Sequence, residues 1–326
     1  MTIDVVCLRP EVDFERVGAL PPASLTVAYR APDDADVPAL LKQARALVIP
    51  AVGPTIPSAW LEGSSIKLVQ VTGAGVDRLD RATIERLGIP VANVPGGSNS
   101  AVAEYAVATA CALLRRLSWA DAEIRQGNYG AVRARMIADS LAGLEGLLVG
   151  VVGFGVVGLA VAQAFHRMGC RICYYDPAPR DPGAAKTIGA EPVPLDELLK
   201  TADVVTLHVP LAPATQGLIG DRELAGMKAG AVLIQASRGG IVDEAALAKH
   251  LESGHLGGAA IDVYSTEPPA ENNPLMALRG DAARRVLFTP HIAGVTRQSA
   301  AFLCRSAWRN VERVLIAGEP PLHRAY

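Results

Sequence analysis

Three glycines with a characteristic spacing, Gly153, Gly155 and Gly158, carry the clearest chemical meaning in this chain. The strand-like run LLVGVVG leads into them and the helix-like run LAVAQAFHRMG follows. A glycine is needed where such a turn is tight, where the backbone approaches a pyrophosphate, and where the helix packs on the strand. The N–H groups at the start of the helix then face the phosphates. The motif therefore predicts a dinucleotide site, and a glycine-rich turn that binds nothing is the alternative.

An acidic residue strengthens this interpretation. Asp176 ends the strand-like run RICYYD, roughly 20 residues beyond the glycines, where a carboxylate can accept hydrogen bonds from both ribose hydroxyls. The same carboxylate repels the additional phosphate of NADP. We therefore expect NAD as the cofactor.

The elements that must position these residues form a regular series. Short apolar runs alternate with helical patterns along the whole chain, which predicts parallel sheets with crossover helices. In the first part, the expected strands are Ile3–Leu8, Leu25–Tyr29, Ala46–Ile49, Lys67–Val71 and Val91–Val94, and the expected helices include Asp36–Ala44 and Asp77–Leu87.

A long helical pattern follows, from Ser100 to about Gln126, and its first half is too apolar for a surface helix. We expect it to be a connector packed between domains. A second strand and helix series runs from Leu147 to His291, and a last helix is expected over Thr296–Ala317. The resulting fold class is α/β, with two doubly wound parallel-sheet domains: residues 1–99 with 295–326, and an inserted domain of residues 100–294.

Composition favours a compact protein that acts on a small molecule. Half of the 326 residues are hydrophobic, 20% are charged, and the net charge is −2, so no global field favours nucleic acid or an acidic membrane. The segment from Met1 to Leu8 has no basic start or apolar signal core, and no apolar run is long enough to span a bilayer. We expect a cytoplasmic location.

The cysteines do not form a metal-binding pattern. They number five and are scattered. Cys170 and Cys173 form a CxxC, but in a strand residues three apart point to opposite faces. No metal is expected, and buried thiols are the preferred interpretation.

Further motifs resemble a known family over nearly the whole chain. The stretches VTLHVPLAPATQGLIG, LIQASRGGIVDEAALAKHLESGHLGGAAIDVYSTEPP and FTPHIAG are similar, in this order, to signatures of the D-isomer-specific 2-hydroxyacid dehydrogenases. VTGAGVDRLD and VPGGSNSAVAEYAV resemble that family's substrate loop and the start of its interdomain helix. The resemblance implies a Rossmann-type NAD domain inserted in a flavodoxin-like substrate domain, with the active site in the cleft between them.

The resemblance also implies roles for single residues. Arg238 would bind the substrate carboxylate, Glu267 would support His291, and His291 would exchange the proton in catalysis. This agrees with the chemistry, because a guanidinium fits a carboxylate and an imidazole beside an acid can act as a proton donor near neutral pH. Arg238 and His291 also follow strand-like runs, and open α/β sheets bind ligands at strand C-terminal ends. A surface ion pair, a loop acid and a structural histidine are the respective alternatives.

Binding contacts are implied in the same way. Asp262 would hold the nicotinamide carboxamide, and His208 would lie beside the cofactor without a catalytic role. Backbone N–H groups near Ala74, Gly75 and Val76 would meet the substrate carboxylate. The implied cofactor-binding set is Gly153, Gly155, Val156, Val157, Gly158, Asp176, His208, Val209, Pro210, Thr215, Ala236, Ser237, Arg238, Asp262, His291 and Gly294.

The chain departs from the family pattern at four notable positions. The family often has Asn at Arg78, His at Tyr105 and Asn at Gln235. Val52 stands where phosphoglycerate dehydrogenases tend to carry an arginine for a second anion. We therefore expect a smaller or less charged 2-keto acid, such as glyoxylate, hydroxypyruvate or pyruvate.

Two alternative functions stay open. The same scaffold serves other hydride donors, such as formate or phosphite, in relatives of the family. Transcriptional corepressors that sense NAD also resemble these dehydrogenases and keep the Arg, Glu and His. The absence of an added tail, a basic region and a disordered segment argues against the corepressor. The apolar helix from Ser100 and the family likeness suggest a homodimer.

Overall fold

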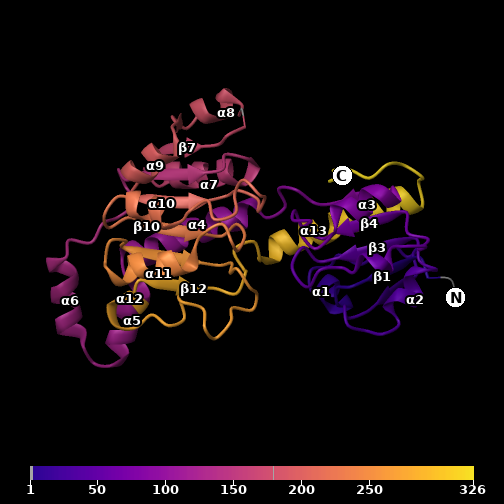
Figure 1. Ribbon diagram of the computed structural model, residues 1–326, viewed down its shortest axis with the longest axis horizontal. Helices are drawn as coiled ribbons and strands as arrows, with labels where there is room; N and C mark the ends of the chain where they lie inside the picture. Colours follow the sequence, from indigo (N-terminus) through magenta and orange to yellow (C-terminus); the bar gives the residue numbers. More distant parts are fainter. Residues whose placement is uncertain (1–2, 179) are drawn as a thin grey trace. The chain divides into compact units, whose positions relative to one another are not determined.

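The computed structural model describes residues 3–178 and 180–326, so Met1, Thr2 and Pro179 lie outside the described residues. The chain divides into two compact units (Figure 1). Unit 1 consists of Met1–Ser98 and Val295–Tyr326, and unit 2 of Asn99–Gly294. No helix in the described ranges is long and apolar enough to cross a membrane.

Unit 1 is built on a parallel sheet that has five strands in the described part of the chain, in the order β2-β1-β3-β4-β5. This is the strand order of flavodoxin-like folds. The strands are β1 (Val5–Cys7), β2 (Val27–Tyr29), β3 (Ala46–Ile49), β4 (Leu68–Val71) and β5 (Val91–Ala92). The helices are α1 (Glu11–Glu15), α2 (Val37–Leu41), α3 (Arg81–Leu87) and α13 (Arg297–Leu315), with a short 3₁₀ helix, η1 (Ser58–Trp60).

Both faces of this sheet are buried. In β3, Leu47 and Ile49 belong to one apolar cluster, whereas Ala46 and Val48 belong to the other. The second cluster includes Trp308 of α13, so the C-terminal helix (yellow in Figure 1) completes a unit whose strands come from the N-terminal part. Covering both faces explains why the strands are apolar runs without alternation.

Unit 2 contains a parallel sheet with seven strands among its described residues, in the order β12-β11-β10-β9-β6-β7-β8. The strand order reverses at β6, because β7 and β8 lie on one side of it and β9 to β12 lie on the other. Ligands bind at such a switch point in open α/β sheets. The strands are β6 (Leu148–Val152), β7 (Arg171–Tyr175), β8 (Glu191–Pro192), β9 (Val204–Leu207), β10 (Val232–Gln235), β11 (Gly258–Ile261) and β12 (Val286–Phe288). The helices are α4 (Asn99–Leu114), α5 (Leu117–Arg125), α6 (Tyr129–Ala138), α7 (Val156–Arg167), α8 (Pro182–Lys186), α9 (Leu195–Thr201), α10 (Asp221–Gly226), α11 (Glu244–Glu252) and α12 (Gly280–Ala283).

The predicted fold class, two doubly wound parallel-sheet domains, is confirmed. The predicted strands of unit 1 are present with ends that differ by a few residues. The expected helix over Asp77–Leu87 begins later, at Arg81, because the Asp80 carboxylate caps it by accepting a hydrogen bond from the Thr83 N–H. The last helix is confirmed as α13, with Thr296 as its N-cap.

The single helix expected over Ser100–Gln126 is wrong. It is two helices, α4 and α5, because Arg116 adopts a left-handed conformation with φ 52°. The side chain of Arg116 pairs with Asp139 and lies over the Trp119 ring, which gives the turn its partners. Neither glycine nor proline marks this break, and α6 was not predicted. In Figure 1, α6 stands off from the sheet of unit 2.

Helix α4 packs within unit 2. Its Ala106 and Ala110 share an apolar cluster with Val161 and Phe165 of α7. These small side chains allow the two helices to approach closely, which accounts for the strongly apolar sequence of α4.

Candidate active site

The three glycines lie between β6 and α7, and each meets different surroundings. Gly153 has φ +92°, and a Cβ there would lie 2.5 Å from the His208 carbonyl oxygen. A Cβ on Gly158 would lie 1.9 Å from the Gly153 carbonyl oxygen. A Cβ on Gly155, in contrast, would meet nothing within 4 Å. The protein itself therefore requires the first and last glycines, and the middle one leaves open space beside the chain.

This open space lies at the start of a helix. Gly155 is the N-cap of α7, and no side chain caps the helix there. Val156 is exposed and Val157 is partly buried. Uncapped N–H groups at a helix N-terminus with room beside them suit a phosphate. The residues present thus fit the pyrophosphate of a dinucleotide.

Asp176 directly follows β7 and lies beside the glycine turn. Its Oδ2 accepts hydrogen bonds from the Phe154 N–H at 2.7 Å and from Nε of Arg180 at 2.7 Å, and its Oδ1 accepts one from the Ala178 N–H at 2.9 Å. Burial alone raises the pKa of Asp176, but the hydrogen bonds from Arg180, Ala178 and Phe154 outweigh it and lower the pKa below its usual value. The side chain is therefore ionised at neutral pH and its oxygens act only as hydrogen-bond acceptors.

The segment after β9 borders the same turn. The His208 N–H donates to the Val152 carbonyl oxygen at 2.7 Å, and its Nε2 lies 2.8 Å from Oγ1 of Thr206. Burial lowers the pKa of His208 to about 3, so its ring is neutral at neutral pH. Thr215 closes the following turn through a hydrogen bond to the Pro210 carbonyl oxygen at 2.6 Å, and Val209 packs on the core. His208 thus supports the loop beside Gly153.

Arg238 lies in a turn that follows β10 and that Gln235 organises. The buried Gln235 amide donates to the Arg238 carbonyl oxygen at 2.8 Å and accepts from Oγ of Ser237 at 2.7 Å. Ala236 between them is partly buried. Gln235 stands where the family often has Asn, and it still supplies a side-chain amide that stabilises the turn. Arg238 itself donates from Nη1 to the Ser237 carbonyl oxygen at 2.7 Å.

The Arg238 turn packs directly on the segment that carries Glu267. A Cβ on Gly239 would lie 1.8 Å from the Tyr264 carbonyl oxygen, so only glycine fits. The Tyr264 N–H in turn donates to Oε1 of Glu267 at 3.2 Å. The Gly-Gly of RGG was the available signal for this close approach, and it was missed.

Glu267 and His291 form a close pair. Oε2 of Glu267 lies 2.8 Å from Nδ1 of His291, and the side chains are 29% and 24% exposed. The carboxylate therefore occupies Nδ1, and Nε2 is the ring nitrogen that can face a substrate. His291 has φ 55°, which is uncommon for a non-glycine residue.

Asp262, at the end of β11, holds the segment that contains His291. Its Oδ1 accepts hydrogen bonds from Oγ1 of Thr289 at 2.6 Å and from the Ile292 N–H at 2.8 Å, and its Oδ2 accepts one from the Ala293 N–H at 2.8 Å. Its carbonyl oxygen accepts the His291 N–H at 2.8 Å. Asp262 is 1% exposed. These bonds fix the backbone on both sides of His291, and a contact of Asp262 with the nicotinamide stays a prediction. Gly294 is the last residue of the unit.

Two tyrosines extend this network. The Tyr264 hydroxyl donates to the Thr289 carbonyl oxygen at 3.0 Å, and the Tyr105 hydroxyl lies 2.8 Å from Oγ1 of Thr289. Burial raises the pKa of Tyr105 to about 12, so it stays a neutral phenol. From the sequence, Tyr105 was noted only as a residue that stands where the family often has His. Thr289 and Tyr264 lie within the quoted motifs but were not singled out.

The backbone N–H groups expected to meet the substrate carboxylate lie in unit 1. Ala74, Gly75 and Val76 follow β4 in an accessible loop, and the Asn93 side-chain amide donates to the Ala74 carbonyl oxygen at 2.6 Å. The loop is thus held at one point while its N–H groups stay near the carboxyl end of a strand.

Arg78 stabilises the neighbouring loop, residues 50–54, from its buried side. Its Nε and Nη1 donate to the carbonyl oxygens of Pro54 and Pro50 at 2.7 and 2.8 Å, and the side chain is buried. Val52, in the same loop, is exposed. Arg78 therefore supports the loop and does not replace an exposed arginine at position 52.

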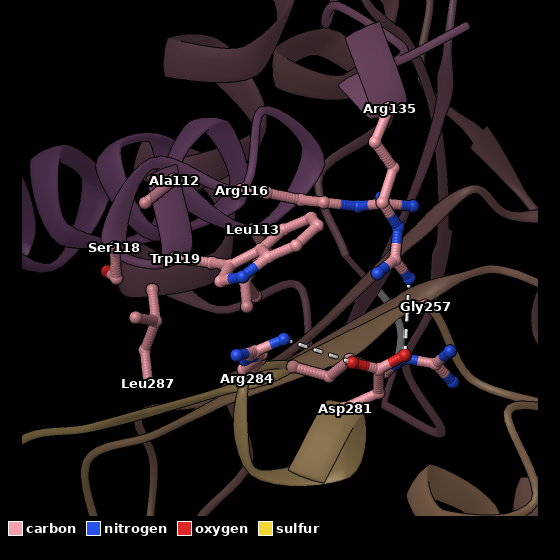
Figure 2. Close-up of a pocket in the computed structure, with 11 residues that line it drawn as sticks. Ala112, Leu113, Arg116, Ser118, Trp119, Arg135, Gly257, Asp281, Arg284 and Leu287 are labelled. Carbon is pink, nitrogen blue, oxygen red and sulfur yellow. Dashed lines mark hydrogen bonds and ion pairs between the residues drawn. The ribbon is translucent and has the colours of Figure 1, made fainter. Parts of the chain in front are cut away.

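A pocket elsewhere in unit 2 does not contain these residues (Figure 2). Its volume is about 50 Å³, and the Trp119 indole lies among the guanidinium groups of Arg116, Arg135 and Arg284. Asp281 pairs with Arg135 and with Arg284. The pocket is too small for a dinucleotide, and Arg116, Arg135 and Arg284 have acidic partners. It is therefore a packing feature, in which the Arg135–Asp281 pair joins α6 to α12.

The cysteines are unpaired thiols. Cys173 lies in one apolar cluster of unit 2 and Cys170 in the other, on opposite faces of the sheet. Burial raises the pKa of each to about 11. Residues 3–178 and 180–326 contain no group of His, Cys, Asp and Glu that could hold a metal ion.

Comparison with known proteins gives consistent similarities. The sequence model for the family described as "D-isomer specific 2-hydroxyacid dehydrogenase, NAD binding domain" matches residues 107–293. A glyoxylate reductase from Korarchaeum cryptofilum is 33% identical over 271 residues, which are 83% of this chain and 80% of that protein. The crystal structure of the holo form of D-mandelate dehydrogenase from Rhodotorula graminis superimposes with a TM-score of 0.85 at 25% identity, covering 100% of this chain and 98% of that chain.

A D-3-phosphoglycerate dehydrogenase from Archaeoglobus fulgidus is 38% identical over 235 residues, which are 72% of this chain but 42% of that protein. The chain spans about half the length of the curated phosphoglycerate dehydrogenases that it matches. The relatives thus share one scaffold and differ in the substrates that their names give.

Proposed function

The chain belongs to the family of D-isomer specific 2-hydroxyacid dehydrogenases, and from this premise we propose that it exchanges a hydride between NAD(H) and C2 of a small D-2-hydroxy acid or 2-keto acid. The observation that carries the proposal is the Glu267–His291 pair, with 2.8 Å between Oε2 and Nδ1, in the same unit as the glycine turn. An imidazole beside a carboxylate can protonate a carbonyl oxygen or deprotonate a hydroxyl near neutral pH.

Each residue has one task in this proposal. Arg238 binds the substrate carboxylate through parallel N–H donors, and the N–H groups of Ala74, Gly75 and Val76 donate to the same carboxylate. NADH, when bound, would supply the hydride to C2. In reduction, protonated His291 gives its proton to the carbonyl oxygen. In oxidation, neutral His291 takes the hydroxyl proton. Glu267 orients the ring through its contact with Nδ1.

The geometry of unit 2 supports the proposed cofactor contacts. Gly155 and the start of α7 would hold the pyrophosphate, and Asp176 would accept the ribose hydroxyls. His208 would stay neutral beside the cofactor, because burial lowers its pKa to about 3.

A small substrate is favoured over phosphoglycerate. Val52 is exposed and uncharged, and Arg78 uses its Nε and Nη1 on loop carbonyl oxygens. The loop therefore offers no exposed guanidinium for a second anion. Glyoxylate, hydroxypyruvate and pyruvate are the preferred candidates.

The test is to measure NADH oxidation by the purified full chain with a panel of 2-keto acids: glyoxylate, hydroxypyruvate, pyruvate and 3-phosphohydroxypyruvate. We expect turnover with at least one of the first three and little with the phosphorylated acid. Arg238→Lys should keep NADH binding and lose most turnover, because one ammonium cannot reproduce two parallel donors. Arg222→Lys, at an exposed arginine of unit 2, is the matched control.

Other outcomes identify the alternatives. A protein that binds NADH yet reduces none of the acids would support the corepressor-like sensor. Oxidation of formate or phosphite with NAD would support the other dehydrogenase types. Near-normal turnover in Arg238→Lys would remove Arg238 from the proposed carboxylate site.

We also propose that the protein is a cytoplasmic homodimer. Helices α5 and α6 carry exposed apolar side chains, among them Leu117, Ile124, Tyr129 and Ile137, and exposed apolar groups on neighbouring helices favour self-association. The unpaired cysteines are consistent with a reducing compartment. Light scattering after size exclusion tests the dimer, and Ile137→Asp should give monomers, whereas a monomeric unmodified protein would contradict it.

A further inference from the structure

Asp176 is paired with a cation from its own loop. Nε of Arg180, four residues further along, donates to Oδ2 of Asp176 at 2.7 Å. The Asp176 side chain is 4% exposed, whereas that of Arg180 is 37% exposed. A lone carboxylate at this position would present a full negative charge to the ribose. Here a guanidinium compensates that charge.

The pairing limits how many hydrogen bonds Asp176 can still accept. A carboxylate has about four acceptor positions, and the N–H groups of Phe154 and Ala178 together with Nε of Arg180 use three of them. Two ribose hydroxyls need two positions. The backbone donors are fixed by the fold, so NAD must compete with Arg180 for the carboxylate.

Arg180 also offers donors to an anion. Its hydrogen bond to Asp176 uses Nε, and a guanidinium carries further N–H donors in a fork that matches phosphate oxygens. The adjacent carboxylate, Asp181, accepts the Gly183 N–H at 2.8 Å and caps α8. A phosphate on the ribose 2′-oxygen would therefore meet a neutralised Asp176 and an accessible guanidinium.

From this geometry we infer that Arg180 sets the cofactor selectivity of the protein. It weakens NADH binding by competing for Asp176, and it supports NADPH binding by contacting the 2′-phosphate, so that NADPH is a usable second cofactor behind NADH. The inference rests on the proposed function, because it requires the ribose to lie at Asp176.

The experiment measures direct binding of NADH and NADPH to the purified full chain by the fluorescence of the reduced nicotinamide, without substrate. The variants are Arg180→Gln and, as a matched control, Arg171→Gln, which removes an exposed arginine at the start of β7, the strand that Asp176 follows. In Arg180→Gln we expect the Kd for NADPH to rise about 10-fold, the factor of one charge-assisted hydrogen bond. The Kd for NADH should fall about 2- to 5-fold, the factor of a partly exposed ion pair.

The opposite directions separate this role from damage to the fold, which would weaken both cofactors together. Equal changes for both cofactors, or an unchanged ratio, would overturn the inference while leaving the dinucleotide site in place. Failure of the unmodified protein to bind either cofactor would instead overturn the proposed function on which the inference rests. The control should match the unmodified protein, and an equal change of its ratio would also refute a role for Arg180.

Discussion

Replacing Asp262 by Asn should separate two roles for this residue, anchoring the His291 segment or contacting the cofactor. The carboxylate accepts hydrogen bonds on both oxygens, from Thr289 and Ile292 on Oδ1 and from Ala293 on Oδ2. Asparagine has one acceptor oxygen, so its amide NH₂ must face an N–H or O–H donor in a site that is 1% exposed.

The expected cost follows from this mismatch. Losing one buried hydrogen bond to a charged group costs about 1.5–3 kcal/mol. For a domain of about 200 residues, such as unit 2, this lowers the unfolding midpoint of the protein without cofactor by about 3–12 °C. A displacement of His291 by about 1 Å should also lower kcat about 100-fold.

Differential scanning calorimetry without cofactor, NADH titration and steady-state kinetics together test this reasoning. We expect a lower midpoint, a small change in the Kd for NADH and a strongly reduced kcat. Asp196→Asn, at an exposed carboxylate of the same unit, is the control and should change none of the three. An unchanged midpoint with a clearly weaker Kd for NADH would refute the anchoring role and show that the carboxylate contacts the cofactor.

Further substitutions probe neighbouring parts of the site. Gly158→Ala should lower the unfolding midpoint, because its Cβ would lie 1.9 Å from a carbonyl oxygen. Gly155→Ala should leave the midpoint unchanged and weaken NADH binding, because its Cβ would enter the open space beside the helix. The reverse pattern in calorimetry and NADH titration would contradict the assignment of the open space. His291→Ala should lower kcat/KM in both directions by about 10²- to 10⁴-fold. Glu267→Ala should also lower kcat/KM in both directions, because the carboxylate that holds Nδ1 of His291 at 2.8 Å is lost, and unchanged kinetics would remove Glu267 from the proposed site. Burial lowers the pKa of His208 to about 3, so between that pH and about 6.5 the unfolded chain binds a proton that the folded state does not. The free energy of unfolding should therefore decrease as the pH is lowered through this window, by up to about 1.4 kcal/mol per pH unit. Denaturant titrations of His208→Asn should show a weaker decrease, and an equal slope would contradict the burial effect.

Much of the fold could be predicted because it follows from local periodicity. Apolar runs such as those of β3 and β6 are buried on both faces of a parallel sheet, and they stand out in the sequence for that reason. Gly153 and Gly158 could be predicted for the same kind of reason, since backbone atoms leave no room for a side chain there. The helix break at Arg116 could not be predicted. Arginine has no preference for a left-handed φ, and Arg116 adopts one where its side chain contacts Asp139 and Trp119.

The sequence by itself determined the fold class, the glycine turn, and the motifs that contain Arg238, Glu267 and His291. Only the tertiary structure decided how these groups are held. Glu267 meets His291 across 24 positions of the chain, and Tyr105 meets Thr289 across 184. Such contacts depend on which strand ends the sheet order brings together, and no local pattern encodes them. The Arg180–Asp176 pair spans only four positions, but it could not be predicted from the sequence either. A loop arginine has many rotamers, and the burial of the Asp176 carboxylate determines which partner it binds.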